Sequence, residues 1–202
     1  MSENRIAPAE APFEPAIAQA FARIMPPGRE PLALFRTMAR NPRVLQRMFA
    51  GSLLDQGTLA LRERELVILR TCARCGSEYE WGVHVSFFAE RAGLDTRIIE
   101  ATCAIPAEPD ELDTRDALLF ALVDELHDHA DLSAATWDAL AAHFSAEHIL
   151  ELIALTGYYH TIAFLTNGLR ITPEPYAARF PAVHSSGGPS SAVVRRKLPM
   201  CT

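Results

Sequence analysis

Apolar residues recur every three or four positions along most of this 202-residue chain, which is the spacing of one buried face of an α-helix. No stretch alternates apolar and polar residues between turn signals, so no strand is predicted. Prolines, glycines and capping residues divide the pattern into segments, and we expect an all-α domain of about eight or nine helices. The expected helices are 15–25, 32–40, 43–54, 61–75 and 77–92, then one beginning at Asp95 and ending before Pro106, one capped by Asp113 or Thr114, one capped by Ser133, and one over 146–167.

The length and composition fit one folded domain flanked by two short segments. Hydrophobic residues make up 49% of the chain, enough to form a sizeable core. Residues 1–14 are rich in Ala, Pro and charged side chains and are expected to be irregular. Residues 183–202 are expected to form a flexible tail because Ser, Gly and Pro are frequent there, and 106–111 is expected to be a polar loop. The predicted domain spans 15–182.

The net charge of −6, with no basic face before the last few residues, argues against binding to nucleic acid. No apolar run reaches the roughly 20 residues that cross a bilayer, so no membrane association is predicted. The first residues contain no hydrophobic signal core, and the expected location is cytoplasmic. In that reducing compartment the four cysteines are expected to be thiols rather than disulfides.

A carboxylate interrupts the apolar face of the helix predicted over 61–75. Glu65 lies in the middle of this face when the helix is wound at 100° per residue. A buried carboxylate needs a hydrogen-bonding or charged partner. One structural explanation is an ion pair with Arg64 or Arg91. The residues that share the face with this glutamate are Leu61, Ile68, Leu69, Cys72 and Cys75.

The next predicted helix offers polar side chains to this carboxylate. Ser77, Glu80 and His84 fall on one face, and the last two, four residues apart, are close enough to touch. If the two helices pack as a hairpin across Gly76, two carboxylates and an imidazole converge in apolar surroundings. Such surroundings shift pKa values and permit acid–base chemistry. The sequence therefore predicts a candidate catalytic site made of Glu65, Ser77, Glu80 and His84.

Structural explanations also exist for these residues. The segment from Ser77 to Glu80 fits a capping box, in which both side chains satisfy backbone N–H groups at a helix start. His84 fits a core histidine. For each residue taken singly the structural explanation is the better one. The coincidence of three polar groups on apolar faces of adjacent helices favours a site.

Cys72 and Cys75 have the C-x-x-C spacing of a dithiol redox motif. The pair falls in the last turn of its predicted helix, where the helix dipole disfavours a thiolate. A redox role for the pair is therefore an alternative and not the leading interpretation.

The remaining candidate motifs favour structural roles. His127 and His129 are two residues apart and do not share a helical face, and no second C-x-x-C completes a zinc site. Tyr158, Tyr159 and His160 are expected in the core, although one of them could border a pocket. Phosphate loops and dinucleotide-binding fingerprints are missing from the sequence. No metal and no cofactor are predicted.

The central hairpin resembles the carboxymuconolactone decarboxylase and AhpD-like (alkylhydroperoxidase-like) superfamily of small all-helical proteins. The resemblance rests on residues 62–70, on Glu78-Tyr79-Glu80-Trp81, on His84 and on Ala92-Gly93-Leu94. It extends more loosely to 152–167.

The superfamily comprises two chemistries. Its alkylhydroperoxidase members carry a glutamate, eleven intervening residues, a C-x-x-C and a histidine four residues further on. Glu65 and His84 match this pattern, but Ser77 and Glu80 occupy the two cysteine positions. A hydroxyl and a carboxylate cannot carry out thiol–disulfide exchange, so the resemblance does not support peroxidase chemistry at those positions.

The decarboxylase members carry E-L-x-x-H, which residues 80–84 resemble. The resemblance implies an acid–base role for Glu80 and His84 without a cofactor, on small carboxylated lactones. Loss of CO₂ leaves an enolate-like anion, which a protonated His84 could stabilise and protonate. A substrate carboxylate would bind a cation, and Arg64 or Arg91 is the nearest candidate.

The leading hypothesis is therefore a cofactor-independent acid–base enzyme acting on a small organic acid, lactone or carbonyl compound. One alternative is an AhpD-like alkylhydroperoxidase, a peroxiredoxin-type thiol oxidoreductase that uses Cys72 and Cys75. Another is a non-catalytic helical oligomer that binds a ligand. The resemblance also implies a symmetric homo-oligomer, in which a neighbouring subunit can supply part of the pocket.

Overall fold

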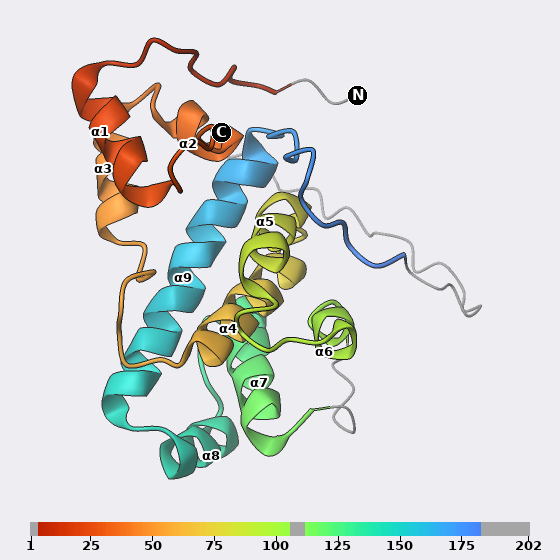
Figure 1. Cartoon of the computed structure of the whole chain (residues 1–202). Helices are drawn as coiled ribbons and strands as arrows, with labels where there is room; N and C mark the ends of the chain where they lie inside the picture. Colours follow the sequence, from red (N-terminus) through yellow and green to blue (C-terminus); the bar gives the residue numbers. More distant parts are fainter. Residues whose placement is uncertain (1–3, 106–111, 183–202) are drawn as a thin grey trace, which may run out of the picture.

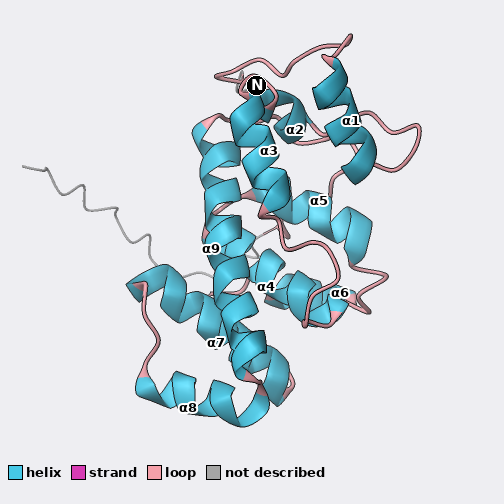
Figure 2. Ribbon diagram, turned by 90° about the vertical axis from the view of Figure 1, so that its left-hand side faces the viewer, coloured by secondary structure: helices cyan, strands magenta, loops and turns pink. Residues whose placement is uncertain are grey.

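The computed structural model describes residues 4–105 and 112–182, and within these ranges the chain forms nine α-helices and no strand (Figures 1 and 2). The predicted all-α class and helix number are confirmed. The loop expected over 106–111 and the tail expected over 183–202 lie outside the described residues. The helices are α1 (Pro15–Ile24), α2 (Ala33–Met38), α3 (Pro42–Ala50), α4 (Leu61–Arg74), α5 (Glu78–Phe88), α6 (Thr96–Ala101), α7 (Thr114–His129), α8 (Ala134–His143) and α9 (Ala146–Gly168).

Helix α4 forms the centre of the domain. It packs against α5, α7 and α9, and Figure 1 shows α9 running along most of the length of the molecule beside it. Leu66, Val67, Ile68 and Leu69 are four consecutive residues of α4 and all are buried. Four consecutive positions cover the whole circumference of a helix, so α4 contacts protein on every side.

The predicted helix starts are confirmed at their caps. The side chains of Asp95, Asp113, Ser133 and Ser145 each accept a hydrogen bond from a backbone N–H in the first turn of the following helix. Each cap satisfies one of the N–H groups that a helix start leaves without an intrahelical partner.

Three details of the predicted helices are wrong. Helix α5 ends at Phe88 and not at residue 92. Helix α3 ends at Ala50 and not at residue 54, because Gly51 ends it and Leu53 adopts a left-handed φ of 51°. Ser77 does not form a capping box with Glu80, since the Ser77 side chain makes no cap hydrogen bond. Its hydroxyl is instead 2.8 Å from that of Thr166 on α9.

Segments outside the helices also pack on the domain. Residues 4–14 contain no helix, and the backbone N–H of Arg5 donates to the carbonyl of Leu169. The segment 171–182 crosses α5, where the Ala178 N–H donates to the Gly82 carbonyl at 3.3 Å. A Cβ atom at Gly82 would lie 2.1 Å from the Ala178 carbonyl oxygen, so only glycine permits this approach.

Helix α9 is long and apolar enough to cross a membrane by length and composition alone. Its position in the fold accounts for this composition, because it packs against α4, α5, α7 and α8 as a core helix. Its buried residues are Ile149, Leu152, Leu155, Thr156, Tyr159, Ile162, Ala163 and Thr166.

A buried arginine joins three elements of the domain. The Arg70 side chain of α4 is 0% exposed, and its Nε and Nη2 donate to the two carboxylate oxygens of Asp124 on α7 at 2.8 and 2.6 Å. Its Nη1 donates to the carbonyls of Thr102 and Ala104, which follow α6. The guanidinium also stacks on Phe120, 5.1 Å from the ring centroid. Such a bidentate pair contributes geometry as well as energy.

We predict that Arg70→Met lowers the free energy of unfolding by about 3 kcal/mol, because it leaves two carbonyls without their donor and Asp124 with only a longer contact to Arg74. The measurement is urea unfolding followed by circular dichroism. The control is Arg179→Ala, since the Arg179 side chain is 59% exposed and pairs with Glu78 at the surface. The control should lose less than about 1 kcal/mol. Equal losses in the two variants would show that Arg70 does not stabilise the fold in this way.

Candidate active site

The turn between α4 and α5 brings the predicted glutamate and histidine together. Gly76 has a φ of +63° and reverses the chain, so that α5 packs against α4. The Nδ1 of His84 lies 2.7 Å from Oε2 of Glu65. Both side chains are buried, with exposed fractions of 3% and 0%. The predicted convergence of these two residues across the hairpin is present in the structure.

Arg64 occupies the other oxygen of Glu65. Its Nε and Nη2 donate to Oε1 of Glu65 at 3.0 and 2.8 Å, and its Nη1 donates to the carbonyl of Leu54. Both oxygens of the buried carboxylate are thus paired with cationic groups. Of the two arginines expected as partners of Glu65, Arg64 is the one that pairs with it.

The Nε2 atom of His84 faces two further groups. It lies 3.0 Å from the hydroxyl of Tyr159 on α9 and 3.5 Å from Oε1 of Glu80, one turn earlier on α5. Glu80 is buried, and its Oε2 has no hydrogen-bond partner among the described residues. An unsatisfied buried oxygen is rare in folded proteins, so this atom needs an explanation.

Electrostatic interactions keep both His84 and Glu65 charged. Burial lowers the pKa of His84, but the charge of Glu65 and its hydrogen bond, helped by Glu80, outweigh burial and raise that pKa from 6.5 to about 9. Burial raises the pKa of Glu65, but His84 and Arg64 outweigh it and lower that pKa below its usual value. At neutral pH His84 is therefore an imidazolium whose Nδ1–H donates to an ionised Glu65.

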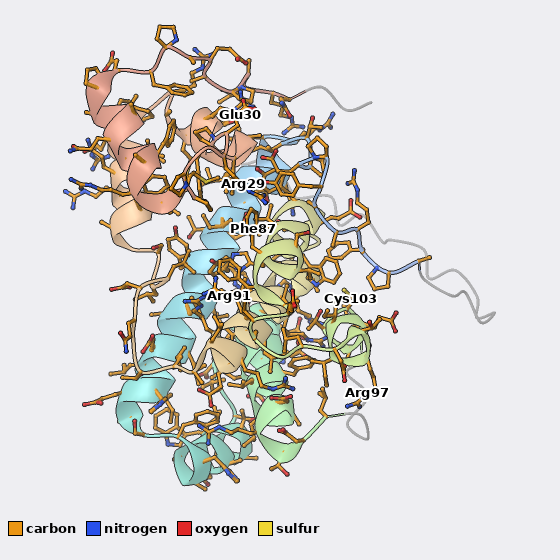
Figure 3. All side chains as sticks on the ribbon, viewed as in Figure 1. Arg29, Glu30, Phe87, Arg91, Arg97 and Cys103 are labelled. Atoms are coloured by element: carbon orange, nitrogen blue, oxygen red, sulfur yellow. The ribbon has the colours of Figure 1, made fainter. Side chains whose placement is uncertain are left out.

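A cavity of about 280 Å³ opens onto this cluster. Glu80 and His84 are its polar floor, and Arg91 lies beside it just after α5. Figure 3 shows Phe87 and Arg91 on the side of α5 that faces the N-terminal helices. The apolar residues that line the cavity are Ile24, Met25, Pro26, Leu32, Phe35, Leu54, Val83, Phe87 and Phe88.

The two candidate cations differ in their availability. Arg64 is half-buried and engaged by Glu65, whereas Arg91 is exposed and forms no ion pair with a described residue. The Arg91 guanidinium lies 5.7 Å from the centroid of the Phe88 ring, and that of Arg64 lies 5.5 Å from it. Arg91 is therefore the cation that can meet an anionic ligand at this cavity.

Ser77 lies apart from the other three candidates. It is fully buried against Thr166 and does not line the cavity. Sequence reasoning missed the contact of Tyr159 with His84, because the tyrosine sits among the apolar residues of α9 and its position looks like core packing. Its hydroxyl was the only sequence signal, since a buried Tyr O–H needs a polar partner.

The two cysteines of the C-x-x-C motif lie at the end of α4. Cys72 is fully buried, and burial, with Glu80, Cys75 and Glu65 also contributing, raises the pKa of its thiol well above the usual value. Cys75 is half-buried, and burial raises the pKa of its thiol despite nearby Arg74. Both groups are therefore thiols at neutral pH and weak nucleophiles.

Several solved structures have the same fold. A peroxidase-related protein from Silicibacter sp. TM1040 is 16% identical, with a TM-score of 0.73 over 90% of this chain and 100% of that one. A peroxidase-related protein with an alkylhydroperoxidase AhpD core, from Ralstonia eutropha JMP134, is 18% identical, with a TM-score of 0.75 over 87% and 94%. The debrominase Bmp8 in complex with 2,3,4-tribromopyrrole is 15% identical, with a TM-score of 0.70 over 85% and 92%.

Sequence comparison points to the same group. No curated protein matches the chain. Residues 41–124, which contain α4, α5 and the candidate site, match the carboxymuconolactone decarboxylase family. This match, which covers less than half of the chain, and the AhpD-like helical fold both support a relationship to the carboxymuconolactone decarboxylase and AhpD-like superfamily.

Proposed function

We propose that the protein is a cofactor-independent acid–base enzyme, similar to carboxymuconolactone decarboxylase, that acts on a small organic acid, lactone or carbonyl compound. The observation that carries the proposal is that Glu80, whose Oε2 is unpaired, lines a cavity beside a protonated His84. A carboxylate with one unpaired oxygen next to a charged acid gives one cavity both a base and a proton donor.

Each residue has a separate role in this proposal. His84 is the general acid, with Nε2–H as the proton that faces the substrate side of the cluster. Glu65 is a positioning residue that holds the imidazole by Nδ1 and keeps it charged. Glu80 accepts a hydrogen bond or a proton from the substrate. The charge of the imidazolium stabilises negative charge that develops in the cavity.

The reaction that fits these roles is proton-assisted decarboxylation. The bond between the substrate carboxylate carbon and its neighbour breaks, CO₂ leaves, and the electron pair passes into an adjacent carbonyl as an enolate. His84 stabilises the enolate and transfers its Nε2 proton to the carbanionic carbon. Water returns a proton to His84, so no oxidant or reductant is required.

The cavity limits the substrate to a small molecule with an apolar surface. Its volume of about 280 Å³ lies at the lower end of the range for ligand sites. Aromatic and aliphatic side chains form most of its wall, and Arg91 offers a cation to a substrate carboxylate. The tribromopyrrole bound by the debrominase of the same fold is also a small apolar ring, which supports this class of ligand.

The alternative thiol chemistry has less support from the geometry. A peroxiredoxin-type mechanism needs a thiolate, and burial raises the pKa of both Cys72 and Cys75. Glu65 and Glu80 further disfavour a negative charge on Cys72. The acid–base cluster, by contrast, contains its charged groups already paired and adjacent to a cavity.

The proposed enzyme is a homo-oligomer. Its proposed partner is a small-molecule substrate, and neither nucleic acid nor a membrane takes part. Two exposed apolar side chains on one side of α9 support self-association, since Leu150 and Phe164 are both 69% exposed and lie about 40° apart around the helix. Size-exclusion chromatography with light scattering measures the assembly, and a monomer at micromolar concentration would contradict it.

We predict that His84→Gln lowers kcat by 10²–10⁴-fold, because glutamine cannot transfer a proton. The measurement is CO₂ release from a panel of γ-lactone carboxylates and β-keto acids. His129→Gln, at the exposed end of α7, is the matched control and should keep full activity. Turnover by His84→Gln at the wild-type rate would refute the acid role. A panel with no substrate, together with no binding of its members in calorimetry, would refute the proposed substrate class.

We predict that activity is lost as the pH rises through about 9, the pKa of His84. In Glu65→Gln the carboxylate no longer offsets burial, so the loss should move to lower pH. The measurement is the pH profile of kcat/KM, with NMR titration of the His84 imidazole as a readout independent of activity. Because folding raises this pKa from 6.5, the stabilisation it provides is complete below about pH 6.5 and is also lost towards pH 9. An unchanged His84 titration in Glu65→Gln would contradict the positioning role.

A further inference from the structure

A second cluster of reactive side chains lies at the other end of the hairpin. Cys75, at the end of α4, meets His127 of α7 and His160 of α9, and their potential ligand atoms all lie within 4.8 Å of one another. The Nδ1 of His127 lies 3.8 Å from the Cys75 Sγ and 3.0 Å from Nε2 of His160. All three residues are half-buried.

These separations are close to those of ligands around one tetrahedral zinc ion. With Zn–N near 2.05 Å and Zn–S near 2.3 Å, two nitrogens lie about 3.3 Å apart and a nitrogen and a sulfur about 3.6 Å apart. The observed 3.0 and 3.8 Å differ from these values by about 0.3 Å or less. Small side-chain rotations would therefore complete the arrangement.

The surroundings orient one imidazole for this role. The Nδ1 of His160 lies 2.9 Å from the carbonyl of Thr156, which can only accept, so Nδ1 carries the hydrogen. Its Nε2 then presents a lone pair to the cluster. A ligand histidine held by a backbone carbonyl in this way is the usual outer support of a metal site.

The backbone at Cys75 is also held in place, and the local charge permits a cation. The side-chain amide of Asn167 donates to the Cys75 carbonyl at 2.8 Å and holds the end of α4 against α9. Arg74 is the nearby positive charge, and it pairs with Asp124 and Asp128. The repulsion that this guanidinium would exert on a metal ion is therefore offset.

The cluster borders a cavity of about 510 Å³, so one coordination position can be open. Its walls contain no further charged group among the described residues apart from Arg74. The residues that line it besides the three candidate ligands are Arg74, Ala163, Phe164, Asn167 and Gly168. Water can therefore supply the fourth ligand, as in zinc sites with three protein ligands.

We propose that Cys75, His127 and His160 bind one Zn²⁺ ion with water as the fourth ligand. On binding, the Cys75 thiol releases its proton to solvent and bonds as a thiolate. His127 moves its proton from Nδ1 to Nε2, and Nδ1 bonds to the metal. The ion links the end of α4 to α7 and α9. A zinc-bound Cys75 is no longer free to form a disulfide with Cys72, so zinc would exclude the dithiol chemistry of that pair.

The experiment uses the full chain without a histidine tag. Titration with ZnCl₂ in a calorimeter, with metal analysis after gel filtration, is expected to give one ion per chain and a higher Tm. Co²⁺ in place of zinc is expected to give the absorption of a thiolate-bound tetrahedral ion. Cys75→Ser and His160→Gln should lose stoichiometric binding. Cys103→Ser and His129→Gln change matched residues outside the cluster and should keep it.

A measurement on the unaltered chain covers the case in which a variant fails to fold. Zinc is expected to protect Cys75 from alkylation by iodoacetamide, as mapped by mass spectrometry, while half-buried Cys103 reacts at an unchanged rate. Absence of stoichiometric zinc binding, binding that survives in Cys75→Ser and His160→Gln, or unprotected Cys75 would each overturn the proposal. None of these outcomes depends on the acid–base activity proposed for Glu80 and His84.

Discussion

The ion pair between Glu65 and His84 is the interaction on which the candidate site depends. A carboxylate at 0% exposure is unfavourable unless it is paired, and the pairing requires α5 to return against α4 in one register. The 2.7 Å contact and the two hydrogen bonds from Arg64 supply that pairing. The same contact that fixes the hairpin therefore also charges the imidazole. The ion pair between Glu65 and His84 is therefore part of both the packing of α5 against α4 and the candidate site.

Two buried charged groups, Arg70 on α4 and Glu80 on α5, have opposite characters. The Arg70 guanidinium is enclosed by Asp124 and two backbone carbonyls, and its hydrogen-bonding capacity is used within the protein. By contrast, one oxygen of Glu80 has no hydrogen-bond partner among the described residues, and Glu80 lines a cavity. A fully satisfied network specifies structure, whereas an unsatisfied atom at a cavity is where a ligand would add a hydrogen bond. This difference separates a structural ion pair from a candidate catalytic one more clearly than burial does.

The all-α fold and the convergence of Glu65 with His84 could be predicted from the sequence, because helical periodicity and the turn at Gly76 are local signals. The contacts that α9 makes with the site could not be predicted from the sequence. Tyr159 and Thr166 meet His84 and Ser77 across more than 70 residues of chain, and the apolar pattern of α9 does not show which neighbour each hydroxyl meets. The same holds for His127, whose partner proved to be His160 on another helix and not His129, two residues away. Tertiary packing, and not spacing, decides such pairs.

The electrostatics of the hairpin also bear on the choice between the proposed acid–base chemistry and the thiol alternative. Glu80 and Glu65 each raise the pKa of Cys72, so the carboxylates that charge the histidine also disfavour a thiolate nearby. The two carboxylates that hold the imidazolium thus also oppose a thiolate on Cys72. The negative charge next to His84 therefore lies on the carboxylates of Glu65 and Glu80 and not on a thiolate. This charge distribution is therefore the physical argument for the proposed acid–base chemistry over the thiol alternative.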